Sequence, residues 1–557
     1  MIQDIHKDFK EFLQLLIERE IVFLVIGGYA VSWHGEPRNT EDIDIWVERS
    51  PANAEKIVNA LRDFGFDEPN LCPELFLRES GFVQMGVKPW RIDLFTSIPG
   101  VEFAPCYVRR EIWPISNLKV PIISLPDLRI NKIASGRPKD FADLAHHLPE
   151  IRTLPTSQLS MTTTIPAPKR NDILWRFSNI KQLDFTNLSG EAVHADQAEI
   201  IARSTGLAKP AAKFVFLNDA VIHSESSLPE NVICLPLADA LVSHPDLVER
   251  HFMQQETRLG SAKFAALHEA SVKNGLFVHV PDNTEAEGTI EIHHWISGQT
   301  TVFPHTLIVT GKSSAVRVVE IFRCADDTTP GLVIAFNDLC AGPNSRLDYI
   351  AIQDLNVTTR LISVNETSTA RDARAKAFIL NTGGSWIRNE SLSRLDGAGS
   401  RSDMLSVSIP DHEQEYDQRT FQHHVSEGAY SDLLYKNPLY GHSKTVFSGL
   451  ISVDEGAHHT DAYQTCRNLL MTDDCEANSM PGLEINADQV KCSHGSTSSQ
   501  IADEEIFYLQ ARGIDPVQAR QLIARGFSVE AVERIGDADT EALVLAFIDA
   551  KFSKVGD

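Results

Sequence analysis

The sequence predicts a multidomain protein in which an α/β domain precedes a long β-rich domain with helical ends. Over residues 1–150, apolar strand-like runs alternate with amphipathic helical segments. Over 285–465, short apolar strands recur between turns rich in Asn, Asp and Gly. Helical periodicity returns after Asp503. A chain of 557 residues is long enough for about three or four domains of ordinary size.

Residues 1–150 are expected to form one α/β domain. Apolar residues at helical spacing predict a helix over 5–20, and the apolar run 21–26 predicts a strand that leads directly into Gly27-Gly28. The further elements expected here are a short helix over 29–33, a strand over 43–47, a helix over 52–64, a strand over 90–95 and a helix over 125–148.

The rest of the chain is expected to contain a linker and three further regions. Ser, Thr and Pro are frequent in 151–170, which predicts the linker. Apolar residues at helical spacing predict a mostly helical region over 171–284. The strands that follow fit a sandwich, a barrel or a parallel β-helix, and no fixed repeat length is visible to choose among them. Helices are expected again over 501–557.

Composition excludes several classes of protein. The net charge of −25 argues against a general nucleic-acid or membrane-surface binder, which needs a basic face. The eight cysteines include no Cys-x-x-Cys pair, which disfavours a zinc ribbon, a ferredoxin-type loop or a thioredoxin motif and fits a reducing compartment. The N-terminus is a charged amphipathic helix rather than a signal peptide, and no apolar run approaches the roughly 18 residues that span a bilayer. We therefore expect a cytoplasmic protein.

The first candidate site combines Gly27-Gly28 with three aspartates. Where a strand leads into a helix, paired glycines let backbone N–H groups approach a phosphate, because glycine has no Cβ. Asp42 and Asp44 are two residues apart on a predicted strand and so share one face, while Asp93 lies in the strand-like WRIDLF. Three carboxylates suit Mg²⁺, and two such ions can hold a triphosphate during in-line transfer. The alternative is that Asp42 and Asp44 only cap turns or helices.

Three segments of this region carry a family resemblance: GGYAVSWHGEPRNTEDIDIWV at 27–47, RIDLF at 91–95 and NKIASGRPKDFADL at 131–144. They resemble the nucleotidyltransferase superfamily, in its AbiEii-like branch, over about residues 5–150. The resemblance implies a nucleotidyltransferase fold, with catalytic and Mg²⁺-binding roles for Asp42, Asp44 and Asp93. It implies that a nucleoside triphosphate is bound by Gly27, Gly28, Arg38 and Thr40. The acceptor stays open between a protein, a tRNA and a small molecule.

The second candidate site is the pair Cys492 and His494. Two residues apart on an extended strand, both side chains face the same way. A thiolate and an imidazole suit iron, zinc or copper, but two ligands are half of a site, so the others must come from elsewhere or from a partner. The alternative is a buried Cys beside an unrelated His. The His doublets at 293–294, 423–424 and 458–459 place neighbours on opposite faces of a strand, which predicts structural or surface roles.

Five segments carry a second resemblance: ILWRFSNIKQLDF at 173–185, PHTLIVTGKSSAVRVVE at 304–320, DAYQTCRNLLM at 461–471, PGLEINADQVKCSHGSTSSQI at 481–501 and EEIFYLQARGI at 504–514. They resemble the SufD family, the scaffold subunits of the SUF machinery for iron–sulfur cluster assembly, over about 165–555. The resemblance implies a right-handed parallel β-helix over 285–500 between a helical region over 171–284 and a second one over 501–557.

The same resemblance implies partners and a site. The expected partners are a paralogous SufB-like scaffold subunit and a SufC-like ABC-type ATPase, which the C-terminal helices would dock. Cys492 and His494 would lie at the interface between the two scaffolds and hold iron or a nascent Fe–S cluster shared with the partner. Cys466 and Cys475 are extra to the family pattern and are expected to be structural.

Two other interpretations stay open at this stage. The chain could be an active Mg²⁺-dependent nucleotidyltransferase that transfers a nucleoside monophosphate to an unknown acceptor and uses the β-helix half as an interaction platform. It could also be a fusion in which each half acts alone. In the SufD-like interpretation, the second half is a scaffold and not an enzyme, and only the N-terminal domain could have catalytic activity.

Overall fold

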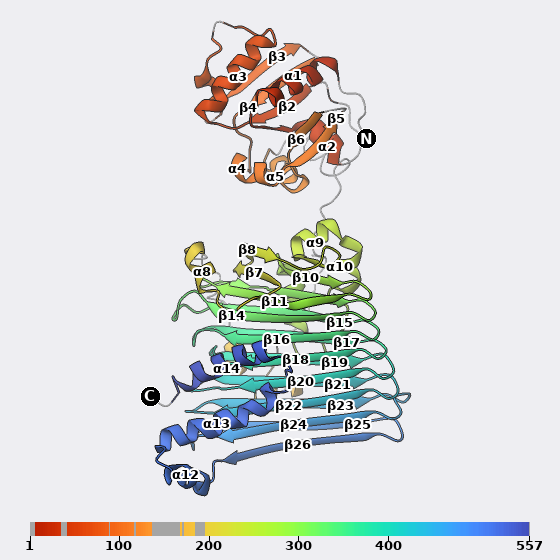
Figure 1. Ribbon diagram of the computed structural model, residues 1–557, viewed down its shortest axis with the longest axis vertical. Coiled ribbons are helices and arrows are strands. Elements are labelled where there is room, and N and C mark those ends of the chain that lie inside the picture. The colour runs from red at the N-terminus through yellow and green to blue at the C-terminus, as the bar shows by residue number, and fades with distance from the viewer. Residues whose placement is uncertain are drawn as a thin grey trace. The chain divides into compact units, whose positions relative to one another are not determined.

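The computed structural model describes residues 6–34, 40, 42–68, 70–78, 80–87, 90–115, 118–135, 168–169, 172–183 and 195–555. The chain divides into two compact units, Met1–Ile151 and Arg152–Asp557 (Figure 1). Most of the predicted linker 151–170 lies outside the described residues.

A six-stranded mixed sheet forms the centre of the first unit, in the order β3-β4-β2-β1-β6-β5. Its strands are β1 Phe23–Ile26, β2 Asp42–Val47, β3 Phe82–Val87, β4 Trp90–Phe95, β5 Glu111–Ile115 and β6 Leu118–Ile122. β2 pairs antiparallel with β1 and parallel with β4. The three predicted strands are confirmed. β3, β5 and β6 were not predicted. In β5 and β6, Pro114 and Pro121 interrupt the apolar pattern, and proline is unusual within a strand.

Helices pack around this sheet, and those predicted from periodicity are confirmed. The first unit contains α1 Lys7–Glu18, α2 Gly27–His34, α3 Pro51–Asp63, η1 Pro73–Phe76, α4 Phe103–Val108 and α5 Leu125–Ser135. α1 buries Phe9, Phe12, Leu13 and Leu16, which is the apolar stripe that the sequence shows. The part of the predicted helix 125–148 that follows Ser135 lies outside the described residues.

A parallel β-solenoid forms the core of the second unit, and each of its rungs contributes one strand to each of two sheets (Figure 1). The first sheet contains β8 Ala220–Ser226, β7 Ala212–Leu217, β11 Glu285–Ile296, β14 Ala315–Cys324, β16 Arg346–Asp354, β18 Arg374–Asn381, β20 Arg401–Ser408, β22 Tyr430–Leu439, β24 Asp461–Leu470 and β26 Lys491–Gln500. The second sheet contains β9 Ile233–Pro236, β10 Gly275–Val280, β13 His305–Thr310, β15 Leu332–Ala341 with β12 Thr301–Val302 beside it, β17 Arg360–Thr369, β19 Trp386–Leu395, β21 Glu415–His424, β23 Lys444–Val453 and β25 Glu476–Ile485. Of the three β architectures left open by the strand pattern, the parallel solenoid is confirmed.

One turn per rung reveals the repeat that the sequence hides. In this turn, every rung places one residue in the left-handed region of backbone conformation, with φ between 54° and 69°, and these residues are about 30 positions apart. They are Asn283, Ser313, Asn344, Asp372, Gly399, Gly428, His459 and Gln489. The backbone N–H of Asn344 donates to the backbone carbonyl of Arg371 in the next rung at 2.8 Å, and other rungs repeat this bond. Because the spacing varies and the residue type changes, no fixed period is visible in the sequence.

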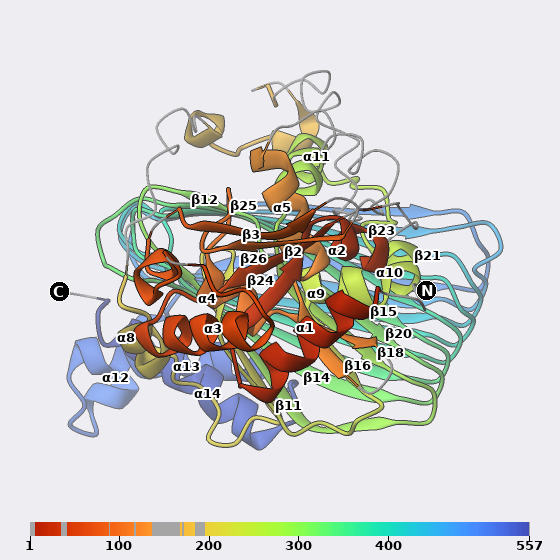
Figure 2. The ribbon, with the colours of Figure 1, turned by 90° about the horizontal axis from the view of Figure 1, so that it is seen from above.

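Helices cover the outer faces of both sheets. α12 Asp503–Gln510, α13 Pro516–Val532 and α14 Ala538–Phe552 pack on apolar residues of the first sheet such as Ile352 and Leu380. Figure 2 shows these helices on one side of the solenoid and α11 Ala262–Ser271 on the opposite side. Asp515 caps α13 by accepting from the amide of Val517, with Pro516 in the first turn. The predicted C-terminal helical region is confirmed.

The region expected to be mostly helical is only partly so. It contains the helices η2 Ile173–Trp175, η3 Ile180–Leu183, α8 Gln197–Arg203, α9 Leu237–Ser243, α10 Pro245–His251 and α11. It also contains strands β7 to β10, which join the solenoid sheets. The prediction was wrong for these strands because short apolar runs such as AKFVFL do not distinguish a buried strand from a buried helix.

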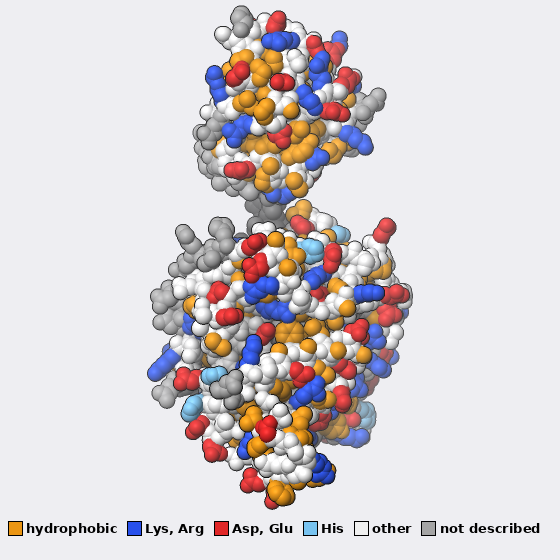
Figure 3. All heavy atoms as spheres, turned by 60° about the vertical axis from the view of Figure 1, so that its left-hand side comes forward, with side chains coloured by type: hydrophobic (Ala, Val, Ile, Leu, Met, Phe, Trp, Pro, Cys, Tyr) orange, Lys and Arg blue, Asp and Glu red, His pale blue; other side chains and the backbone are white. Residues whose placement is uncertain are grey.

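Among the described residues, none of the helices combines the length and the hydropathy needed to cross a bilayer. In the view of Figure 3, acidic and basic side chains are interspersed over both units. Hydrophobic side chains gather at the lower end of that view, where the C-terminal helices lie.

Candidate functional site

The N-terminal sheet brings the three predicted carboxylates together. Asp44 on β2 and Asp93 on β4 are register partners on adjacent parallel strands, and Asp42 is the partner of Arg91. Since side chains two residues apart share a face, all four point to the same side of the sheet. Burial raises the pKa of Asp44 to about 6, and repulsion from Asp42 and Asp93 acts in the same direction. Burial also raises the pKa of Asp93.

Glycine is required at positions 27 and 28 because side chains of the acidic site lie close to the backbone there. Gly27 has φ of +66°, and a Cβ there would lie 2.6 Å from Cγ of Asp44. A Cβ on Gly28 would lie 2.5 Å from Oγ1 of Thr40. Thr40 in turn donates to Oδ1 of Asp42 at 2.9 Å. Gly27, Gly28 and Thr40 therefore lie at the predicted site, while Arg38 is outside the described residues.

Arg91 is the site residue that the sequence pattern did not reveal. Its Nη2 lies 2.6 Å from Oδ2 of Asp42 and 3.0 Å from Oδ2 of Asp93. The carboxylates have the right chemistry for Mg²⁺. As they stand, however, no three His, Cys, Asp or Glu side chains of the described residues form a group that could hold a metal ion. The guanidinium lies between two of the predicted ligands instead.

At the other end of the chain, β26 is the last strand of the solenoid, and it carries Cys492 and His494. Their register partners on β24 are Ala462 and Gln464. Gln464 is buried between the two sheets, so both site residues face the interior of the solenoid at its open end. His494 is exposed there, and Cys492 is half-buried. Burial raises the pKa of the Cys492 thiol, with Asp461 acting in the same direction.

The open end exposes two strand edges and a polar interior. β25 and β26 each terminate a sheet, so their outer edges have no neighbouring strand among the residues that the structure describes. Such an edge is a template for pairing with another chain. The interior behind it is hydrogen-bonded, since Asn437 donates to Asn468 at 2.8 Å and Asn468 donates to Oγ of Ser498 at 3.2 Å. The open end is therefore a surface suited to a protein partner.

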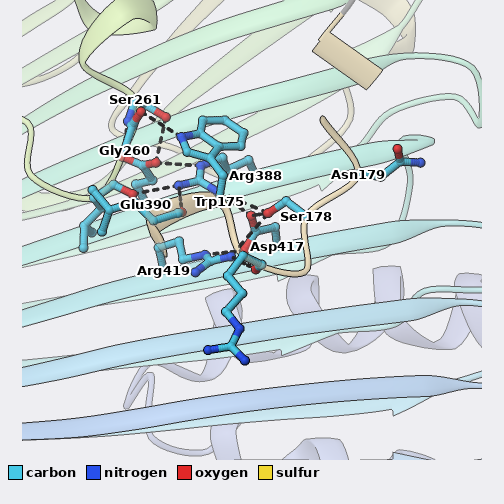
Figure 4. A network of polar contacts seen from close by, with 12 residues as sticks. Trp175, Ser178, Asn179, Gly260, Ser261, Arg388, Glu390, Asp417 and Arg419 are labelled. Atoms are coloured by element: carbon cyan, nitrogen blue, oxygen red, sulfur yellow. Dashed lines mark hydrogen bonds and ion pairs between the residues drawn. The ribbon is translucent and has the colours of Figure 1, made fainter. Parts of the chain in front are cut away.

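A buried charge network fastens the N-terminal segments of this unit to the second sheet (Figure 4). Arg388 on β19 is fully buried, and its Nε donates to Glu390 at 2.6 Å. Its Nη1 also pairs with Asp417 on β21, and Asp417 accepts from Nε of Arg419 at 2.6 Å. The signal for this network in the sequence is the alternation Arg-x-Glu on one strand and Asp-x-Arg on the next.

Arg388 holds two separate segments of the chain. Its Nη2 donates to the carbonyls of Leu174 at 3.0 Å and Leu259 at 2.7 Å. The guanidinium also lies 3.6 Å from the ring centre of Trp175, whose Nε1 donates to the carbonyl of Gly260 at 3.1 Å. This role is structural, because Arg388 and its two carboxylate partners, Glu390 and Asp417, are buried and Arg388 joins the two segments.

Two family models match the second unit. The model described as "SufBD protein N-terminal region" matches residues 208–292, and "SUF system FeS cluster assembly, SufBD core domain" matches residues 294–527. The C-terminal two thirds of this chain belongs to the SufBD family. The matched residues include strands β7 to β26 and α12, so the family accounts for the solenoid and its first C-terminal helix.

The matches between this chain and its SufBD relatives cover most of the length of each relative. The iron–sulfur cluster assembly protein SufD of Bacillus subtilis is 24% identical over 425 residues, which is 74% of this chain and 96% of the relative. SufD of Escherichia coli is 28% identical over 402 residues, or 70% of this chain and 90% of the relative. A SufBD family protein of Synechocystis is 26% identical over 388 residues, or 66% and 84%.

Several SufBD-region residues have structural partners, as the sequence predicted. His293 and His294 pair with Glu291 and Glu320, each at 2.7 Å, on opposite faces of β11. Cys466 is buried inside the solenoid, and burial raises the pKa of its thiol to about 12.

The two remaining doublets and the second extra cysteine follow the same pattern. His423 lies 3.0 Å from Asp454, and His424 lies 2.8 Å from Ser431. Nδ1 of His458 lies 3.4 Å from the carbonyl of Asp488 on the turn of the next rung. Cys475 donates to the carbonyl of Leu439 at 3.2 Å.

Proposed function

We propose that this protein is a SufD-like scaffold subunit that assembles iron–sulfur clusters together with a SufB-like scaffold and a SufC-like ATPase. The observation that carries the proposal is the extent of the match, which spans residues 208–527 and 90% or more of two SufD relatives. All eight cysteines are free, which fits a reducing compartment, and we place the assembly in the cytoplasm.

The open end of the solenoid is the proposed surface for the SufB-like partner. Strand edges of the partner can extend the sheets that end at β25 and β26, because main-chain hydrogen bonding across such edges is a common mode of association. Cys492 and His494 then supply two ligands for iron or a nascent cluster, which is cargo of the assembly rather than a resident cofactor. The partner supplies the rest.

The C-terminal helices are the proposed surface for the SufC-like ATPase. α12 and α13 expose large apolar side chains that do not contribute to the core: Phe507 is 70% exposed, Tyr508 57%, Val517 56% and Leu522 50%. An exposed apolar patch of this kind is typical of a protein-binding surface. Phe507→Ser is expected to reduce retention of the ATPase without unfolding the protein, because the side chain is mostly in solvent.

Co-expression with SufB- and SufC-like subunits, followed by affinity capture of this chain, tests the proposal. Both subunits should be retained by the wild type. His494→Ala should lower the iron bound by the captured complex, whereas His442→Ala, which removes another exposed imidazole of the same unit, should not. Capture of neither subunit would reject the proposal.

A second candidate function, for the N-terminal unit alone, is transfer of a nucleoside monophosphate from a nucleoside triphosphate. It is supported by the convergence of Asp42, Asp44 and Asp93 beside Gly27. Incubation with labelled nucleoside triphosphates should label an acceptor, and Asp44→Asn should abolish the labelling. Asp67→Asn, which changes an exposed aspartate of the same unit, is the matched control. Labelling that survives Asp44→Asn would remove the assigned site.

A further inference from the structure

Arg91 bridges two carboxylates of the N-terminal site through a single nitrogen. Its Nη2 contacts Oδ2 of Asp42 at 2.6 Å and Oδ2 of Asp93 at 3.0 Å. The other oxygen of each carboxylate is held by a neutral donor, Thr40 at 2.9 Å and Gln84 at 3.0 Å. Both Oδ2 atoms therefore converge on one positive charge, which is the arrangement that a shared metal ion would have.

The fit of the guanidinium at this position is incomplete. A guanidinium usually binds a carboxylate through two parallel hydrogen bonds. Here Nε of Arg91 is buried and has no hydrogen-bond partner among the described residues. The side chain is also 24% exposed, so it borders solvent on one side. Asp44 adds a third negative charge next to the pair. Lys132, which is buried, also acts on Asp44 electrostatically. The three carboxylates still outnumber the two cationic side chains by one, so the site retains an attraction for a further cation.

We propose that Arg91 is an internal substitute for a divalent cation and that the two compete for the same oxygens of Asp42 and Asp93. Binding of the ion displaces the guanidinium toward solvent. This accounts for a set of carboxylates that have the chemistry for Mg²⁺ but do not form a metal-holding group as they stand. The inference concerns binding of the ion and rests on the second candidate function only for the use of that ion.

Titration of the full-length protein with Mn²⁺, followed by electron paramagnetic resonance, tests the competition. Arg91→Gln should bind Mn²⁺ about tenfold more tightly than the wild type, because it removes a positive charge beside the two carboxylates. Arg91→Lys keeps the charge and should stay near the wild type. Arg62→Gln removes a surface arginine that pairs with Asp67 in the same unit, and should change nothing.

A second readout uses the unmodified protein. Saturating Mn²⁺ should raise the reaction of Arg91 with phenylglyoxal, measured by peptide mass analysis, while reaction of Arg62 stays constant. This measurement decides the question even where Arg91→Gln does not fold. Unchanged or reduced labelling of Arg91 would overturn the inference.

The outcomes separate binding from catalysis. Equal or weaker Mn²⁺ binding by folded Arg91→Gln overturns the inference, as does a gain in affinity that survives Asp42→Asn in the same chain. A gain that requires Asp42, in a protein that labels no acceptor with nucleotide, supports the inference and rejects the second candidate function.

Discussion

Replacement of Arg388 by methionine should destabilise the second unit far more than any surface substitution. Arg388 is fully buried, and it neutralises Glu390 and Asp417 while it donates to two backbone carbonyls. Removing one partner of a buried ion pair costs about 3–5 kcal/mol, because a charge is left uncompensated in the interior. Arg419 still pairs with Asp417, so we expect about 3 kcal/mol, the lower end of that range.

Equilibrium unfolding in urea, followed by tryptophan fluorescence and circular dichroism, gives the free energy of unfolding of this unit. Arg371→Met is the matched control, since its side chain is 78% exposed and a surface pair contributes at most about 1 kcal/mol. Trypsin cleavage within 172–183 should also become faster in Arg388→Met, because that segment loses its anchor on the second sheet. A change below about 1 kcal/mol with unchanged cleavage would refute the role given to the network.

Three further predictions concern the first unit and the C-terminal helices. The folded-state pKa of Asp44 is raised to about 6 from 3.8, so the first unit should lose up to about 3 kcal/mol of stability as the pH rises from about 4 to 6. Asp44→Asn should remove that loss, as measured by urea unfolding with chelator present. Equal dependence of stability on pH in the two proteins would contradict the assignment. Gly27→Ala should cost the first unit more than about 2 kcal/mol, because the added Cβ meets Asp44 and φ is positive, whereas Gly65→Ala, with open space around it, should show only the cost of its positive φ. Phe507→Ser together with Leu522→Ser should lower retention of the SufC-like ATPase in the capture assay and leave the SufB-like subunit bound. Retention of the ATPase equal to that of the wild type would show that the C-terminal helices do not bind it.

The sequence predicted those features that depend on local periodicity. The spacing of two between Asp42 and Asp44, and between Cys492 and His494, correctly places each pair on one face of a strand. The helices that follow Asp503 were likewise visible from apolar residues at helical spacing. These signals need no knowledge of what lies across the fold.

The features that were missed depend on residues distant in the sequence. Arg91 becomes a site residue only because β4 pairs in register with β2. Arg388 and Asp417 meet because successive rungs stack, and their position under residues 172–183 cannot be read from either strand alone. The strands β7 and β10 were mistaken for helix because they are largely buried on both faces, which removes the alternation by which a strand is normally recognised.

The most direct test of the central claim is the native mass of this chain after co-expression with its SufB- and SufC-like counterparts. A SufD-like subunit should be recovered in an assembly that contains both counterparts, with association through the open end formed by β25 and β26. Recovery of the chain only as a monomer, or only with copies of itself, would contradict the assignment.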